Sequence, residues 1–393
     1  MTPGGPAPSA AALPERQRWT EWLRAELAPA PGRWHGTVCV LIATTIVLVT
    51  SMTLEVPILS LSLFIALFIL KAAGTDAQGG MDVRRVAIAG VVVVTLALAL
   101  TMLILRLTMD APPLRVAAMA ITFFVGMWFS RVFKVRTLGY VVGLIVLVSQ
   151  AYVDVFPSPE AAVRTVLWIW VVVAYPALVA VGVKLLLAPS VKDGKEGEQG
   201  EESEEAAKAA EAPKPAPAHT GPWMPDAWTN PAYVQFAVKA TIAAMLCYVF
   251  YTAVDWPGIH TIMITCAVVA LGSTEATLHK SRLRLAGCAV GGALALGVIV
   301  FVFPRLDSIG SLAVVVAAVT APAAWIALGS ERLAYLGVQM AFTFYISTLQ
   351  GFAPDFDVTG FRDRFVGIVL GVLVMGLVFT FVWPERAGTE VAP

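Results

Sequence analysis

Charged residues are scarce in this 393-residue sequence, and their scarcity excludes water as the main solvent of the chain. Only 14% of the residues are charged, whereas soluble globular domains carry about 25%. The chain is instead 58% hydrophobic, and its mean hydropathy is +0.78. Its formal net charge is zero, which leaves no basic field to attract nucleic acid, so we expect no nucleic-acid partner.

Cysteine and histidine are also rare, with four of each, and none of them forms a recognisable site. Cys39, Cys247, Cys266 and Cys288 lie singly in apolar segments, without CxxC spacing or a nearby histidine pair. We interpret them as packing residues and not as disulfides or metal ligands. The patterns GxSxG, GxxxxGK[ST] and HExxH are missing as well, so we expect no enzyme, no cofactor and no metal.

Long apolar runs are what the sequence does contain, and they recur from Gly36 to the C-terminal end. A helix needs roughly 20 such residues to cross the bilayer core. Because lipid offers backbone groups no hydrogen-bond partners, the runs predict an all-α polytopic membrane protein. We expect about twelve transmembrane helices, at residues 36–53, 56–71, 86–105, 116–130, 137–155, 165–187, 232–253, 258–272, 286–303, 311–328, 334–350 and 364–383.

Polar segments divide the chain into two membrane halves of six helices each. An acidic linker rich in Ala and Pro follows the first half and has no apolar periodicity. The N-terminal segment contains an amphipathic pattern over 15–27, which predicts a helix at the bilayer interface; a soluble helix packed on loops is the alternative. The predicted units are 1–35 (N-terminal segment), 36–189 (first half), 190–230 (linker), 231–384 (second half) and 385–393 (tail).

The two halves are repeats of one another. Four anchors recur in order: Glu55-Val-Pro57 with Asp255-Trp-Pro257, Arg85 before Gly90 with Arg282 before Gly287, Leu138-Gly139 and Ser149 with Leu336-Gly337 and Ser347, and Pro189 with Pro384. An even number of helices per half makes both halves enter the membrane from the same side. The sequence therefore predicts two parallel six-helix repeats around a pseudo-two-fold axis along the membrane normal, an arrangement that suits a central pathway.

Basic residues in the short loops predict the orientation of these helices. With both termini in the cytoplasm, the inner side carries fifteen Lys and Arg residues, namely Arg16, Arg18, Arg24, Arg33, Lys71, Arg84, Arg85, Arg131, Lys134, Arg136, Lys280, Arg282, Arg284, Arg332 and Arg386. The outer side carries six, namely Arg106, Arg115, Arg164, Arg305, Arg362 and Arg364. We therefore expect cytoplasmic termini and a cytoplasmic linker.

Four short motifs resemble the fusaric acid resistance and aromatic acid exporter family of inner-membrane transporters. They are the run from Glu26 to Trp34, the Asp255-Trp-Pro-Gly-Ile259 segment, the basic loop from Lys280 to Gly287, and Trp383-Pro-Glu-Arg386. The resemblance implies an efflux component in the bacterial inner membrane that exports aromatic or other organic acids with a periplasmic adaptor and an outer-membrane channel. Plant malate channels resemble the same plan more distantly. A passive organic-anion channel and a membrane scaffold are the alternatives.

An exporter of organic anions needs cations along its pathway to offset the substrate carboxylate. Arg85 and Arg282 occupy equivalent repeat positions, and with Arg284 and Lys239 they are our candidates for the substrate pathway. Anchoring to lipid phosphates is the alternative for the arginines, and snorkelling of the side chain to the inner surface is the alternative for Lys239.

Carboxylates at the outer ends of two helices are candidates for proton coupling. Glu55 and Asp255 precede the second helix of each half, and His260 lies one turn beyond Asp255. A histidine titrates near neutral pH and suits such a relay. Helix capping by the two carboxylates is the alternative interpretation.

Three GxxxG spacings predict close helix contacts. They are Gly139/Gly143, Gly287/Gly291 and Gly367/Gly371. We assign them to packing and not to function.

Overall fold

The computed structural model describes residues 21–22, 24–74, 82–134, 136–152, 158–188, 221–256, 258, 260–270, 274–351 and 358–383. Within these ranges the chain is helical, and the only extended pairing is an isolated bridge between Phe133 and Trp223. The first half consists of α2 (Arg33–Thr53), α3 (Leu59–Ala73), α4 (Val83–Thr108), α5 (Pro112–Val132), α6 (Arg136–Tyr152) and α7 (Pro159–Leu186). The second consists of α9 (Pro231–Ala253), α10 (Thr261–Val269), α11 (Thr274–Phe301), η4 (Phe303–Arg305), α12 (Ile309–Ala327), α13 (Glu331–Thr348) and α14 (Thr359–Phe381).

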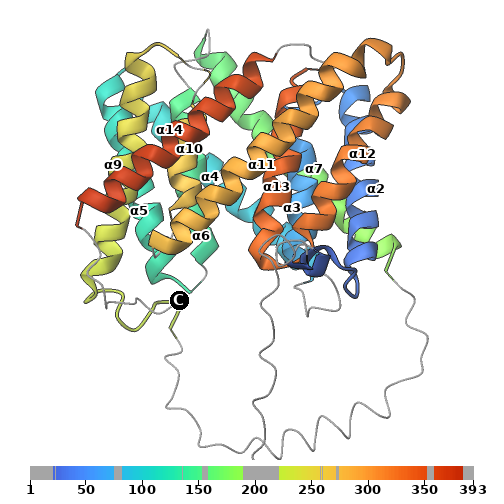
Figure 1. Ribbon diagram of the computed structural model, residues 1–393. Helices are drawn as coiled ribbons and strands as arrows, with labels where there is room; N and C mark the ends of the chain where they lie inside the picture. Colours follow the sequence, from blue (N-terminus) through green and yellow to red (C-terminus); the bar gives the residue numbers. More distant parts are fainter. Residues whose placement is uncertain are drawn as a thin grey trace, which may run out of the picture.

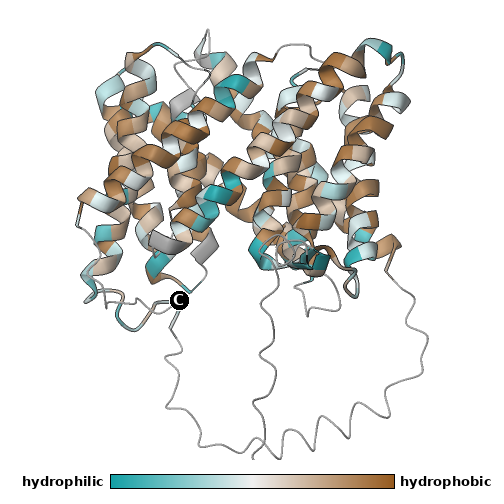
Figure 2. Cartoon of the chain, viewed as in Figure 1, coloured by the Kyte–Doolittle hydropathy of each residue, from teal (hydrophilic) through white to brown (hydrophobic). Residues whose placement is uncertain are grey.

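Eight of the described helices are long and apolar enough to cross a membrane. These are α2, α4, α5, α7, α9, α11, α12 and α14, whereas α3 and the apolar part of α6 are shorter, and α10 has only nine residues. Figure 2 shows mostly hydrophobic helices with hydrophilic residues gathered at their ends. The chain is therefore a multi-pass, all-α membrane protein, while the count of twelve spans stays a prediction.

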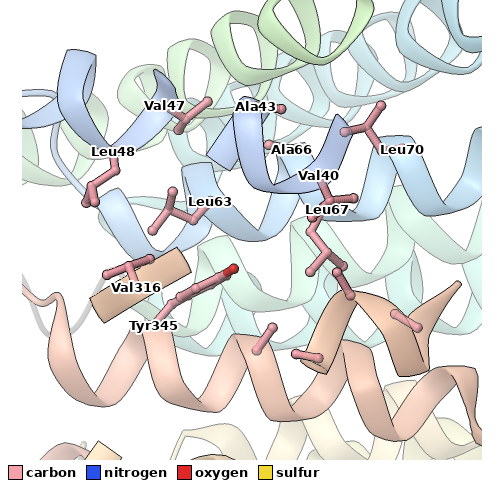
Figure 3. Packing of buried hydrophobic residues seen from close by; sticks show 14 of the residues in the cluster. Val40, Ala43, Val47, Leu48, Leu63, Ala66, Leu67, Leu70, Val316 and Tyr345 are labelled. Carbon is pink, nitrogen blue, oxygen red and sulfur yellow. The ribbon is translucent and has the colours of Figure 1, made fainter. Parts of the chain in front are cut away.

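The two largest hydrophobic cores of the bundle each combine helices from both halves. In the first, α2 and α3 pack against α12 and α13, and Tyr345 of α13 lies beside Leu63 and Val316 (Figure 3). In the second, α9, α10 and α14 pack around Phe123 of α5 and Leu147 of α6. The halves are consequently interlocked, with α12 against α2 and α5 against α9 (Figure 1).

Glycines allow the closest helix contacts, as the GxxxG spacings predicted. A Cβ added at Gly139 of α6 would lie 2.8 Å from the carbonyl oxygen of Gly126 in α5. A Cβ at Gly287 of α11 would lie 2.7 Å from the carbonyl oxygen of Leu336 in α13, and one at Gly371 of α14 would lie 2.6 Å from that of Ile262 in α10. Only a residue without a side chain fits these three seams. The predicted close packing is thus confirmed at these positions.

The cysteines behave as packing residues. All four are buried. Cys247 and Cys266 lie on the adjacent helices α9 and α10 with their sulfur atoms 3.4 Å apart. No disulfide joins any of them, as expected.

Several predicted features fall on residues that the structure leaves undescribed. Residues 190–220 of the predicted linker, the predicted tail 385–393 and the anchors Pro189, Pro257 and Pro384 lie outside the described residues, whereas residues 221–230 of the linker are described. The predicted amphipathic helix is described only from residue 21, where 21–22 and 24–27 are helical. The N-terminal ends of α2 and α9 lie on the same side of the molecule, at the bottom of Figure 1.

Candidate functional site

Buried charge in the described part of the chain is entirely positive. Five cationic side chains are buried, namely Arg33, Arg115, Lys239, Arg284 and Arg364, and no described aspartate or glutamate is. Burying a charge is costly unless polar groups or a counterion compensate it. The partners of each cation therefore show whether it serves the fold or is available to a ligand.

Two of these cations are bound to main-chain carbonyls at helix ends. Arg33 donates to the carbonyl oxygen of Trp325 at 2.8 Å and to those of Glu26 and Ala28 at 3.0 and 2.9 Å. Lys239 donates to the carbonyl oxygen of Trp383 at 2.7 Å, just beyond the end of α14. These contacts explain the burial of both side chains by structure alone. They favour the snorkelling interpretation of Lys239 over a place in the substrate pathway.

Arg284 differs because only neutral side chains bind it. Its Nε donates to the Thr265 hydroxyl of α10 at 3.2 Å. One terminal nitrogen donates to the Tyr335 hydroxyl at 2.8 Å and to the amide oxygen of Gln339 at 3.2 Å, both on α13. We call Arg284, Lys280, Thr265, Tyr335 and Gln339 the Arg284 cluster.

The guanidinium of Arg284 is buried between helices. The residue is only 3% exposed, and it ends the polar run from His279 to Arg284 that precedes the apolar part of α11. Burying such a charge costs several kcal/mol unless other groups compensate it. No described carboxylate forms an ion pair with it, so three neutral hydrogen bonds carry its whole compensation.

The charge next to Arg284 is positive too. Lys280 lies one turn earlier on α11 with its Nζ 5.2 Å from the ring centroid of Tyr335, whose hydroxyl accepts from Arg284. Lys71 pairs with Glu331 at 3.7 Å, at the exposed rim. Figure 2 shows this part of α11 as a hydrophilic band among hydrophobic helices. The cluster therefore concentrates positive potential between α10, α11 and α13.

The other predicted pathway arginines lie elsewhere. Arg85 and Arg282 are both exposed, on α4 and α11 respectively. Their position suits the lipid-anchor alternative, and the structure brings neither of them into the Arg284 cluster. Arg284 is the predicted pathway residue that the fold buries among polar groups.

The capping interpretation of Glu55 and Asp255 is wrong, because both residues end a helix instead of starting one. Each has a positive φ, 52° and 53°, directly after α2 and α9. The amide that follows each residue bonds back across the turn, from Val56 to Ser51 at 2.9 Å and from Trp256 to Tyr251 at 3.1 Å. This is the Schellman arrangement that closes a helix.

The N-cap positions of the next helices are Ile58 for α3 and His260 for α10, and neither side chain makes a capping hydrogen bond. The side chains of Glu55 and Asp255 are exposed, and that of His260 is half-buried. Their role in proton coupling stays a prediction.

The sequence alone did not predict the neutral partners of Arg284, nor the burial of Arg364. A visible signal was the spacing on α13, where Tyr335, Gln339, Thr343 and Ser347 follow one another at intervals of four residues. Residues four apart share one helix face, so this spacing defines a polar stripe within an apolar helix. The last three of these side chains are buried.

Comparisons with known proteins match part of this chain. The family model described as fusaric acid resistance protein-like matches residues 243–382. The multidrug resistance proteins MdtO of Shigella flexneri and of Escherichia coli (strain K12) are each 45% identical to this chain over 173 residues, which is 44% of this chain and 25% of the relative. The chain thus spans about a quarter (25%) of the length of these curated relatives. No solved structure matches it.

The matched segment contains α10 to α14, and with them every member of the Arg284 cluster. The basic loop from Lys280 to Gly287 and the Asp255-Trp-Pro-Gly-Ile259 segment, on which the resemblance rested, also lie inside it. The resemblance to this family is therefore confirmed over residues 243–382, the part of the chain that the family model matches.

Proposed function

We propose that this protein is an inner-membrane efflux transporter for small organic anions, in particular aromatic carboxylates, and that it binds the anion at the Arg284 cluster. The observation that carries the proposal is a buried guanidinium with neutral partners only. The relatives are described as multidrug resistance proteins, a description that fits transport and not catalysis.

A carboxylate would complete the Arg284 cluster chemically. The amide nitrogen of Gln339 is buried and has no hydrogen-bond partner among the described residues, so a donor next to the guanidinium is available. Lys280 adds a second positive charge one turn away. Hydrogen bonds to charged groups contribute about 1.5–3 kcal/mol each. An anion at this point would offset both the unpaired charge and the unused donor.

The proposed architecture is twelve spans in two parallel repeats. Buried positions recur 200 residues apart in α2 and α9, for example Val40 with Ala240 and Val47 with Cys247. The helix pairs recur as well: α2 packs on α3 as α9 does on α10, α5 on α6 as α12 does on α13, and α4 on α6 as α11 does on α13. This pattern supports a pseudo-two-fold axis. The distribution of basic residues supports cytoplasmic termini, and the family resemblance alone suggests a periplasmic adaptor and an outer-membrane channel as partners.

A passive organic-anion channel is the second candidate function, because a path lined by cations would serve it equally well. Energy coupling separates the two. Benzoate efflux from proteoliposomes that stops when the proton gradient is collapsed at fixed voltage indicates a coupled exporter. Benzoate current that continues under the same conditions indicates a channel.

The Arg284→Gln variant tests the site itself. We expect it to weaken the apparent affinity for transported benzoate about tenfold or more, since 1.4 kcal/mol corresponds to a factor of ten. Arg282→Gln, two residues away on the same helix and exposed, is the matched control and should retain wild-type affinity. Transport is normalised to inserted protein. Equal affinity in both variants would remove Arg284 from the pathway.

A further inference from the structure

The polar stripe on α13 leads from the Arg284 cluster to a second buried cation. Arg364, in the second turn of α14, is 6% exposed. Its Nε donates to the Thr343 hydroxyl at 3.4 Å, and its guanidinium lies 4.4 Å above the ring of Phe342. Thr343 lies four residues beyond Gln339 on the stripe, a rise of about 6 Å.

One residue of α11 links the two ends of this stripe. Cys288 lies one turn beyond Arg284 on α11, is fully buried, and hydrogen bonds with Thr343. Ser347, the next member of the stripe, has a fully buried hydroxyl without a hydrogen-bond partner among the described residues. An unused donor thus lies one turn beyond Thr343, as the unused Gln339 amide lies beside Arg284.

The positions of the first half that correspond to Arg284, Gln339 and Thr343 are apolar. The repeat offsets of 197 for α4/α11 and 198 for α6/α13 pair these residues with Ala87, Val141 and Ile145. Tyr335 and Ser347 have polar counterparts, Thr137 and Ser149, so the first half keeps part of the polar stripe but has no counterpart of the Arg284 cation. A path that used both halves equally would need cations and hydrogen-bonding groups in both.

We infer that Arg364, Thr343 and Ser347 form a second anion-binding station, and that an organic carboxylate passes between it and Arg284 along α13, within the second half alone. The inference rests on the proposed function and adds to it a second site and a one-sided path. The two stations differ in character. Arg284 is surrounded by hydroxyl and amide groups, whereas Arg364 lies on an aromatic face, so the ring of an aromatic carboxylate would find apolar contact there.

The inference predicts a stoichiometry that can be measured without transport. Equilibrium binding of radiolabelled benzoate to the purified full-length chain in lipid nanodiscs should show two sites per chain. The Arg284→Gln and Arg364→Gln variants should each retain one benzoate site per chain. Thr343→Val and Ser347→Ala should weaken benzoate binding only at the Arg364 station, which is the site that survives in Arg284→Gln. The expected loss of affinity for Thr343→Val is about tenfold. A single site in the wild type would overturn the inference.

Arg362→Gln is the matched control, because Arg362 lies two residues from Arg364 on α14 but is exposed and pairs with Asp363 at 2.8 Å. It should retain both sites. If Arg364→Gln also retained both, the second station would be refuted while the proposed function stood. Two sites in a protein that fails to transport benzoate would refute the proposed function and leave the stations in place. Arg364→Lys, which keeps the charge, should keep two sites and shows that the protein folds.

Discussion

The seam between α5 and α6 offers a direct test of the fold through a single methyl group. A Cβ added at Gly126 would lie 2.7 Å from the carbonyl oxygen of Gly139, and 2.8 and 3.1 Å from the Cα and nitrogen of Gly143. All three are backbone atoms, so no side chain can rotate away. Carbon contacts are favourable at about 3.5–4.0 Å. Gly126→Ala should therefore push the two helices apart by about 1 Å.

The energetic cost of this substitution can be separated from helix propensity. Overpacking costs about 1–3 kcal/mol, whereas replacing glycine by alanine inside a helix gains about 0.5–1 kcal/mol. Gly90, on α4, has no atom within 4 Å of an added Cβ. The Gly90→Ala variant should therefore show the gain in helix propensity without any cost of overpacking. Because the propensity gain is common to both variants, the stability difference between them measures the overpacking at the α5–α6 seam.

Thermal unfolding of the detergent-purified variants, monitored by size-exclusion chromatography, provides the measurement. We expect Gly126→Ala to melt below the wild type and Gly90→Ala at or above it. In domains of 150–250 residues, 1 kcal/mol corresponds to roughly 2–4 °C, so a difference of a few degrees is expected. Equal melting temperatures for the two variants would refute the close approach of α5 and α6.

Three further predictions concern regions outside the membrane spans. Ser203→Cys in a cysteine-free background should resist an impermeant thiol reagent applied to the periplasm of intact cells, because the linker is predicted to be cytoplasmic; labelling would reverse the orientation. Deleting part of residues 201–217 should retain transport, since this segment is too polar to form a core; lost transport with normal insertion would make the linker regulatory. Hydrogen bonds from Asn230 and Tyr233 hold the pKa of Asp226 below its ordinary value. This carboxylate therefore stabilises the fold above the unfolded-state pKa of about 3.9, and the contribution is lost as the pH falls through the lowered value. The wild type should lose its melting-temperature advantage over Asp226→Asn below about pH 4, and a pH-independent difference would contradict this.

The helices were predictable because apolar runs in lipid leave the backbone little choice. The span predicted at 86–105 corresponds to α4, Val83–Thr108, and the one predicted at 311–328 to α12, Ile309–Ala327. The least accurate prediction is 286–303, because α11 begins at Thr274, twelve residues earlier. The first turns of this helix are polar, and hydropathy detects only the apolar part of a helix.

The site was less predictable because it depends on the rotation of one helix. Arg282 and Arg284 are neighbours in the sequence, but two residues turn an α-helix by about 200°, so one side chain faces outward when the other faces inward. Equivalence within the repeat favoured Arg282, whereas burial identifies Arg284. The neutral partners Thr265 and Gln339 come from other helices, and only the tertiary packing brings them together.

The motif that precedes α2 finds a structural explanation at Arg33. Its three main-chain acceptors belong to two separate segments, the residues before α2 and the C-terminal part of α12, so one guanidinium joins the N-terminal segment to the second half. The guanidinium also lies 4.6 Å above the ring of Trp325, whose indole nitrogen donates to the carbonyl oxygen of Leu27 at 3.0 Å. A lysine carries the same charge but cannot direct donors to both segments while stacking on the ring.

Arg33→Lys should therefore destabilise the protein without changing its charge pattern or its predicted orientation. Losing one or two hydrogen bonds to a charged group costs about 1.5–3 kcal/mol each, so the apparent melting temperature should fall by several degrees. The matched control is Arg84→Lys, because Arg84 is exposed at the start of α4, and surface substitutions change stability by at most about 0.5 kcal/mol. Cleavage by a protease after residues 24–28 should also speed up in Arg33→Lys alone, since this segment would lose its attachment to α12. If Arg33→Lys and Arg84→Lys have the same melting temperature and the same cleavage rate, Arg33 does not join the N-terminal segment to the second half. The motif from Glu26 to Trp34 would then need an explanation other than this contact.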